Sequence, residues 1–252
     1  MFALTPMVRN ILLLNLLIFV LGQFLGLDLS ELFGLSAFGS SNFQPYQIIT
    51  HLFIHASWMH ILGNMLGLII FGPKLEMIWG PGRFLVFYFA CGFGASFLHF
   101  LVNAVELQML LKDINAYSLD PSYISFDRFV ATRHLTGFLD FVNAFGDHET
   151  DPAYLAKSKE YLRAYYVQMQ NSSLVGASGA IFGILLAFGM TFPRDILYIL
   201  FVIPLEARFV VILYVAFELY VTLQAAPNDN VAHFAHLGGM IFAFLFARRW
   251  AS

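Results

Sequence analysis

The sequence predicts an all-α membrane protein, a bundle of six transmembrane helices with a long extramembrane insertion between the third and the fourth. Hydrophobic residues make up 59% of the 252 residues and charged residues only 12%, and the mean hydropathy is +0.73. Apolar runs long enough to cross a hydrocarbon core, about 20 residues each, recur along the chain. Residues 104–172 interrupt these runs with a polar composition. We expect residues 1–252 to form a single membrane domain in contact with the lipid bilayer.

The charge balance excludes one class of partner. The formal net charge is −3 and the isoelectric point is near 6.2, whereas a nucleic-acid-binding protein needs a concentrated basic face. No nucleic acid is therefore expected as a partner. The single cysteine, Cys91, lies in an apolar stretch, where it is a small hydrophobic residue that cannot form an internal disulfide.

The first three spans are separated by turn-forming residues. Residues 10–27 are apolar and are not followed by a small-residue cleavage site, which favours a retained span over a signal peptide. Residues 28–57 are mixed and predict a partly structured outer loop. The second span is expected at 59–71, ending at Gly72-Pro73, and the third at 84–102.

The segment 104–172 is predicted to be an extramembrane insertion. It holds nine of the 16 acidic residues and six of the 13 basic residues. Its later part begins with Thr150 and Asp151 as helix caps and Pro152 as a helix opener, which predicts an amphipathic helix. This helix lies either on the bundle or membrane interface or in solvent as a linker, and the sequence leaves both open.

The fourth span begins near Ser178 and ends before Pro193. About 15 helical residues reach only about 22 Å, less than the hydrocarbon thickness, so we expect this helix to start below the membrane surface. Residues 196–204 are expected at the interface, 209–223 form the fifth span, and 231–247 form the sixth.

The positive charges predict the orientation of the chain. Outside the insertion, each lysine and arginine lies at an end that six alternating spans place on one side, and the positive-inside rule makes that side cytoplasmic. We expect a multi-pass protein of the cell (inner) membrane with both termini in the cytoplasm, and with the insertion and the loop around Asn228 outside. The basic residues are Arg9, Lys74, Arg83, Arg194, Arg208, Arg248 and Arg249.

A serine at the start of the fourth span is the first candidate for chemistry. Ser178 is flanked by Gly176, Ala177, Gly179 and Ala180, so little blocks the approach of a substrate carbonyl to its hydroxyl. Backbone N–H groups at a helix N-terminus also favour a developing oxyanion. Small residues in this pattern serve more commonly as a helix-packing face in membrane proteins.

A second cluster precedes and opens the second span. His60 and Asn64 stand four residues apart on one helix face, and both can donate hydrogen bonds to an oxyanion. His51 and His55 lie upstream, and capping the loop or holding the span against it is the role expected for them.

A third cluster opens the sixth span. His233 and His236 are three residues apart and are followed by Gly238 and Gly239, which allow close approach to a neighbouring helix. If that neighbour is the fourth span, His236 comes within reach of Ser178, as a general base must.

The sequence predicts a Ser-His dyad without a third member or a metal. Glu218 is the only acid within a span, but its position does not indicate that it faces His236, so we expect it to be paired structurally or to lie near the outer interface. A metal site would need three or four converging ligands, and the HExxH motif is absent. No cofactor is expected.

Taken together, GASGAIFG with Ser178, HLFIHASWMHILGN with His60 and Asn64, and AHFAHLGG with His236 resemble the rhomboid intramembrane serine proteases. The resemblance implies that Ser178 is the nucleophile and His236 the general base. It also implies an oxyanion hole formed by His60, Asn64 and the Ser178 backbone N–H. The expected substrates are transmembrane proteins, cleaved in or near their membrane segments in a hydrated cavity. Further residues expected to line that cavity are His233, Gly176 and Phe182.

Two other functions fit parts of the pattern. A catalytically silent rhomboid-like protein would bind transmembrane helices without cutting them. A small transporter would use the histidines as a proton relay. The sequence does not indicate the oligomeric state.

Overall fold

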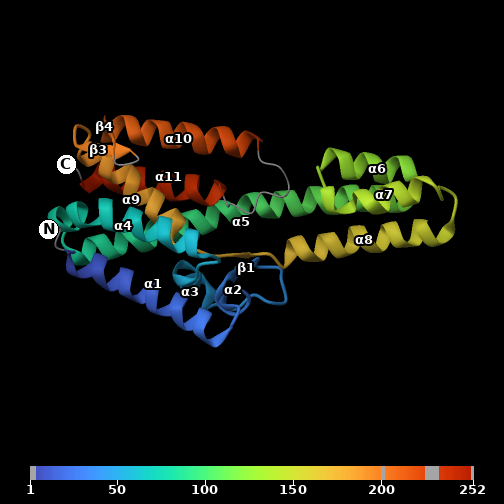
Figure 1. Ribbon diagram of the computed structural model, residues 1–252, viewed down its shortest axis with the longest axis horizontal. Coiled ribbons are helices and arrows are strands. Elements are labelled where there is room, and N and C mark those ends of the chain that lie inside the picture. Colours follow the sequence, from blue (N-terminus) through green and yellow to red (C-terminus); the bar gives the residue numbers. More distant parts are fainter. Residues whose placement is uncertain (1–3, 200–201, 225–232, 251–252) are drawn as a thin grey trace.

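The computed structural model describes residues 4–199, 202–224 and 233–250. Figure 1 shows a helical bundle with a long arm extending from one end, and one helix, α5, runs through both parts. The bundle helices are α1 (Pro6–Leu25), α4 (Trp58–Trp79), the first half of α5 (Pro81–Leu119), α9 (Ser178–Thr191), α10 (Ala207–Gln224) and α11 (His233–Trp250).

Three of these helices, α1, α4 and α5, are long and apolar enough to cross a membrane, and α9 is a shorter apolar helix. Large apolar side chains are exposed on the outside of the bundle, among them Leu13 and Leu17 of α1 and Ile212, Leu213 and Phe217 of α10. A contiguous apolar exterior of this kind is suited to lipid. The helical membrane fold agrees with the sequence, and the count of six crossings stays a prediction.

Two predicted span boundaries are wrong. Helix α4 does not end at Gly72-Pro73 but runs through Pro73 to Trp79. Proline removes one backbone hydrogen bond, and burial of Leu68, Gly72 and Leu75 on both sides holds the helix together. Helix α5 does not end at residue 102 but continues to Leu119, so the insertion begins as an extension of a bundle helix.

The arm is built on the far half of α5 and has its own apolar core. It contains α6 (Tyr123–Thr132), the 3-10 turn η2 (Thr136–Phe138), α7 (Leu139–Gly146) and α8 (Pro152–Gln170). The fully buried side chains at its centre are Phe126, Phe145 and Leu162.

Helix α8 begins as the sequence predicts. Pro152 opens it, and the side chain of Asp151 accepts a hydrogen bond from the Ala153 N–H. The helix packs against α5 within the arm, as Figure 1 shows.

The loop after α1 is tied to the segment that precedes α9. This loop contains α2 (Leu29–Phe33), β1 (Leu35–Ser36), α3 (Gln47–Thr50) and the 3-10 turn η1 (His51–Phe53). Strand β1 pairs antiparallel with β2 (Ser173–Leu174), with Leu35 opposite Leu174 and Ser36 opposite Ser173. The pairing fixes the chain four residues before Ser178.

The segment after α9 forms a β-hairpin rather than the simple interfacial stretch expected at 196–204. Strands β3 (Ile196–Ile199) and β4 (Ile203–Glu206) pair antiparallel, with Ile196 opposite Glu206. The predicted outer loop around Asn228 and the predicted start of the sixth span at residues 231–232 lie outside the described residues.

Small residues bring α5, α9 and α11 into close contact, as predicted for the fourth and sixth spans. A Cβ placed on Gly239 of α11 would lie 1.9 Å from the backbone oxygen of Gly179 of α9. A Cβ on Gly183 would lie 2.7 Å from Cys91 Sγ of α5 and 3.1 Å from the Gly239 oxygen. The backbones at these positions approach too closely for any larger residue.

A buried glutamate of α4 caps the start of α1. Glu76 is 2% exposed, and its two carboxylate oxygens accept hydrogen bonds from the backbone N–H groups of Met7 and Val8 at 2.9 and 2.8 Å. Thr5 also donates its hydroxyl to this carboxylate. These N–H groups have no partner inside α1, so Glu76 supplies the cap that the α1 sequence lacks.

Candidate active site

The serine turn has a backbone conformation that only glycine adopts easily. Ser178 is the first residue of α9 and is half-buried. Two residues earlier, Gly176 has φ +113°, and its N–H donates a hydrogen bond of 2.9 Å to the backbone oxygen of His51. A Cβ on Gly176 would lie 2.5 Å from His60 Nε2. Glycine is therefore required here both for its dihedral angle and for its small size.

His60 and Asn64 of α4 face this turn. The same Cβ on Gly176 would lie 3.8 Å from Asn64 Nδ2. Asn64 is 6% exposed, and its Nδ2 has no hydrogen-bond partner among the described residues. A buried amide donor without a partner is uncommon, and its position beside the serine turn suits an oxygen atom of a substrate.

His236 of α11 lies against the face of α9 that carries Ser178. Its ring is stacked on Phe182, with centroids 4.0 Å apart and planes inclined by 12°. Phe182 is one helical turn after Ser178, and residues four apart share a helix face. His60 and His236 are also close enough for their charges to interact. The serine turn, α4 and α11 thus meet at one place.

Among the described residues, the Ser178 hydroxyl is not hydrogen-bonded to His236. The hydrogen bonds of catalytic groups are often long or misaligned without substrate and shorten in the complex. The structure therefore brings Ser178 and His236 to the same helix face without a direct bond between them.

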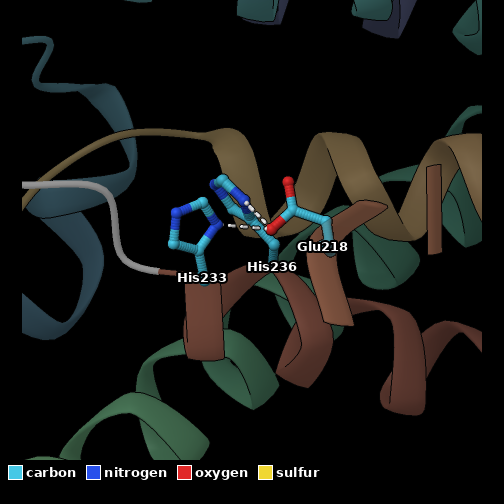
Figure 2. Close-up of side chains that lie close together, drawn as sticks. All are labelled: Glu218, His233 and His236. Atoms are coloured by element: carbon cyan, nitrogen blue, oxygen red, sulfur yellow. Dashed lines mark hydrogen bonds and ion pairs between the residues drawn. The ribbon is translucent and has the colours of Figure 1, made fainter. Parts of the chain in front are cut away.

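Glu218 does face His236, although its position in the sequence does not indicate this contact. Figure 2 shows one oxygen of the Glu218 carboxylate joined by dashed lines to both imidazoles. Its Oε2 lies 2.7 Å from His233 Nδ1 and 3.1 Å from His236 Nδ1. All three side chains are buried, and Glu218 is only 3% exposed. This contact depends on how α10 is rotated about its own axis relative to α11. Packing between the helices sets that rotation, so it cannot be read from the α10 sequence.

Glu218, His233 and His236 are also residue types that hold metal ions, and their ligand atoms lie within 4.8 Å of one another. Two atoms bound to one tetrahedral zinc at bonds of about 2.1 Å stand about 3.4 Å apart. The 2.7 Å between Glu218 Oε2 and His233 Nδ1 is shorter than this and is typical of a charge-assisted hydrogen bond. The geometry therefore fits hydrogen bonding better than metal ligation.

His51 has a structural position beneath the site. Its Nδ1–H donates to the Gln47 oxygen at 2.8 Å, and its Nε2 accepts from the Ser96 hydroxyl of α5 at 2.8 Å. Burial lowers the pKa of His51 to about 4, which favours the neutral ring that these two bonds require. Since the His51 backbone also binds Gly176, this residue links α5 to the serine turn.

His55 contacts a residue of the candidate oxyanion hole. Its ring packs edge-on against His60, with centroids 5.0 Å apart. Burial, and then the nearby His60, lower the pKa of His55 to about 4. A neutral His55 adds no positive charge beside His60.

Sequence reasoning missed two features that shape the site: the β1–β2 pairing and the bond from Gly176 to His51. Strands of two residues leave no periodic signal, and their partners are far apart in the chain. Glu218 is the single acidic residue of α10, and a buried acid in a membrane helix is a functional candidate by default. The sequence therefore indicates Glu218 as a candidate, but it does not indicate which residues Glu218 contacts.

The fold and the site define a class of protein: a helical membrane bundle in which a serine, a histidine and two further donors from three helices lie close together beside the loop that follows α1. A sequence model of the Rhomboid domain family matches residues 42–110 and 154–250, more than half of the chain. The chain belongs to the rhomboid family. Residues between the two matched stretches lie in the arm.

Curated proteins with rhomboid names are similar to this chain. It is 25% identical over 206 residues to the RHOMBOID-like protein 12, mitochondrial, of Arabidopsis thaliana, covering 82% of this chain and 46% of that protein. It is 34% identical over 69 residues to the Rhomboid-like protease 3 of Toxoplasma gondii, covering 27% of this chain and 26% of that protein. The chain thus spans less than half the length of these relatives.

Proposed function

We propose that this protein is an intramembrane serine endopeptidase that cleaves peptide bonds in or near the transmembrane segments of other membrane proteins. One observation carries the proposal: His236 is stacked on Phe182, one turn from Ser178, and the turn that leads into Ser178 lies beside His60 and Asn64. Family membership supports the reaction class, because relatives of this chain include a protein named as a rhomboid-like protease.

In the proposed reaction, Ser178 Oγ attacks the carbonyl carbon of the scissile peptide bond. The hydroxyl proton passes to His236 Nε2, and the carbonyl oxygen becomes an oxyanion that accepts hydrogen bonds from Asn64 Nδ2, from His60 and from the Ser178 backbone N–H. The C–N bond then breaks, and His236 returns its proton to the leaving nitrogen. Water, activated in turn by His236, hydrolyses the acyl-enzyme.

The short helix α9 gives a physical reason why this chemistry can occur in a membrane protein. Its 14 residues span only about 21 Å, so a Ser178 at its start lies below the membrane surface, where a hydrated cavity can open outward. We place six crossings in a cell (inner) membrane, with both termini in the cytoplasm and the arm outside. A substrate helix would unwind at small or helix-breaking residues to enter in extended form.

The proposal is tested with purified protein in liposomes that contain a panel of tethered transmembrane reporters. Wild-type protein is expected to cut at least one reporter, and Ser178→Ala to cut none while keeping the wild-type melting temperature. Ser172→Ala is the matched control, since Ser172 is exposed in the preceding loop, and it should cut normally. Cleavage by Ser178→Ala at the wild-type rate contradicts the proposal. Binding of a reporter by wild-type protein without any cleavage would indicate the silent helix-binding alternative.

A further inference from the structure

We propose that Glu218 is a positioning residue for His236, so that the proposed protease works through a Ser178–His236–Glu218 triad rather than through a dyad. His233 anchors the same carboxylate from the preceding turn of α11. This inference rests on the proposed function and assigns a role to a buried acid that the dyad mechanism leaves unused.

The tautomer of His236 depends on the group that faces its Nδ1. Glu218 Oε2 lies 3.1 Å from this atom, an ion-pair distance whose angle does not form a hydrogen bond in this structure. A carboxylate accepts hydrogen bonds and carries negative charge, so its position favours the tautomer with the proton on Nδ1. The lone pair is left on Nε2, the atom that must accept the Ser178 proton.

The orientation of the His236 ring is held by contacts with two other helices. Phe182 covers one face of His236 at a centroid distance of 4.0 Å, which fixes the plane of the imidazole. The contact with Glu218 fixes its rotation within that plane. Two constraints from two different helices, α9 and α10, thus hold one catalytic side chain, as precise proton transfer requires.

The Glu218 carboxylate is itself anchored by His233. His233 Nδ1 lies 2.7 Å from the same oxygen, so a single atom of α10 contacts two consecutive turns of α11. A buried carboxylate is costly without partners, and the hydrogen bond with His233 reduces that cost. With His233 in place, Glu218 has little freedom to turn away from His236.

The proton balance leaves Glu218 ionised throughout. When Ser178 attacks, its proton moves to His236 Nε2, and the ring becomes an imidazolium with protons on both nitrogens. The Glu218 charge, 3.1 Å from Nδ1, stabilises this cation, and no proton moves to the carboxylate. When the C–N bond breaks, the Nε2 proton leaves with the amine, and the neutral tautomer is restored.

The test compares Glu218→Gln and Glu218→Asp with wild-type protein by steady-state cleavage of a tethered reporter. In Glu218→Gln, an amide N–H can donate to His236 Nδ1 and favour the wrong tautomer. We expect its kcat to fall at least tenfold with KM within twofold of the wild-type value. Glu218→Asp keeps the carboxylate and should recover part of the lost kcat.

Glu76→Gln is the matched control, because Glu76 is also a buried helix glutamate but caps α1 far from His236. It should lower the melting temperature and leave kcat of the folded protein unchanged. If Glu218→Gln behaves in the same way, or if Glu218→Asp is no better than Glu218→Gln, Glu218 is merely structural and the proposal is overturned.

A second measurement reads the tautomer of His236 in the wild-type protein itself. The nitrogen-15 spectrum of histidine-labelled wild-type protein, assigned through His236→Gln, should show a proton bonded to Nδ1 of neutral His236. A neutral ring protonated on Nε2 overturns the proposal. Ser178→Ala tests the proposed protease activity separately from the triad. If Ser178→Ala loses cleavage while Glu218→Gln keeps a normal kcat, the triad is overturned and the protease activity stands.

Discussion

The imidazole of His236 lies flat on the ring of Phe182, 4.0 Å between centroids and 12° between planes. This contact joins the last bundle helix to the helix that begins with Ser178. Phe182 is also in edge contact with Tyr214 of α10, with centroids 5.8 Å apart. The Phe182 ring therefore contacts both the proposed base and α10, and its removal should loosen the base more than it weakens the fold.

Substitution of Phe182 tests that relationship. Phe182→Ala removes the surface on which His236 rests, so we expect kcat to fall about 10- to 100-fold, the loss typical of a misplaced catalytic group. Phe182→Tyr keeps the ring and should stay within threefold of wild type. Cleavage assays on both variants, with melting temperatures as a check of folding, measure the effect. Equal activity of the two variants would show that the stacking does not position His236.

Replacement of Asn64 should lower activity without lowering the stability of the fold. Its Nδ2 is buried without a partner among the described residues, so its replacement removes an unsatisfied donor and should leave the melting temperature unchanged or raise it. If Asn64 binds the oxyanion, Asn64→Ala loses about 10²- to 10³-fold in kcat. Reporter cleavage and thermal unfolding on the same preparation give both values. A lower melting temperature with near-normal kcat would assign Asn64 to the fold instead.

Gly176 is predicted to tolerate no side chain. Gly176→Ala places a Cβ 2.5 Å from His60 Nε2 at a backbone angle of φ +113°, so the turn must move away from the proposed oxyanion hole. We expect loss of most activity, measured by reporter cleavage. Gly82→Ala is the control, since a Cβ there meets nothing within 4 Å. Comparable activity in the two variants would show that the turn is not rigid.

Much of the fold could be predicted, because lipid imposes long apolar runs and small-residue contacts on the sequence. The start of α9 at Ser178 and the close approach of Gly179 to Gly239 both follow from such patterns. The end of α4 could not be predicted in the same way. Pro73 locally favours the end of a helix, but the packing of Leu75 against the core keeps the chain helical beyond it.

The site residues could be proposed from motifs, but their mutual arrangement could not. His60 and Asn64 share a face because four residues make about one helical turn. The pairing of Glu218 with His236 depends on the rotation of one helix against another, which no single segment encodes. The hydrogen bond from Gly176 to the His51 backbone is likewise a contact between distant segments.

Buried neutral histidines should make the fold sensitive to acid. The pKa of His51 is lowered from 6.5 to about 4, so between these pH values the unfolded chain binds more protons than the folded chain. Stability is therefore expected to fall as the pH drops through this window. Melting temperatures from pH 7.5 to 4.5 should show a decline that His51→Gln makes shallower. The exposed His148→Gln should leave the decline unchanged, and an identical slope in His51→Gln would contradict the assignment.

Labelling by a fluorophosphonate, with the adduct located by mass spectrometry, tests the central claim most directly, because such probes react with an activated serine whatever the natural substrate is. The account predicts an adduct on Ser178 in wild-type protein, no adduct in Ser178→Ala, and strongly slowed labelling in His236→Ala. An unlabelled but folded wild-type protein, or labelling that persists in Ser178→Ala, would contradict it.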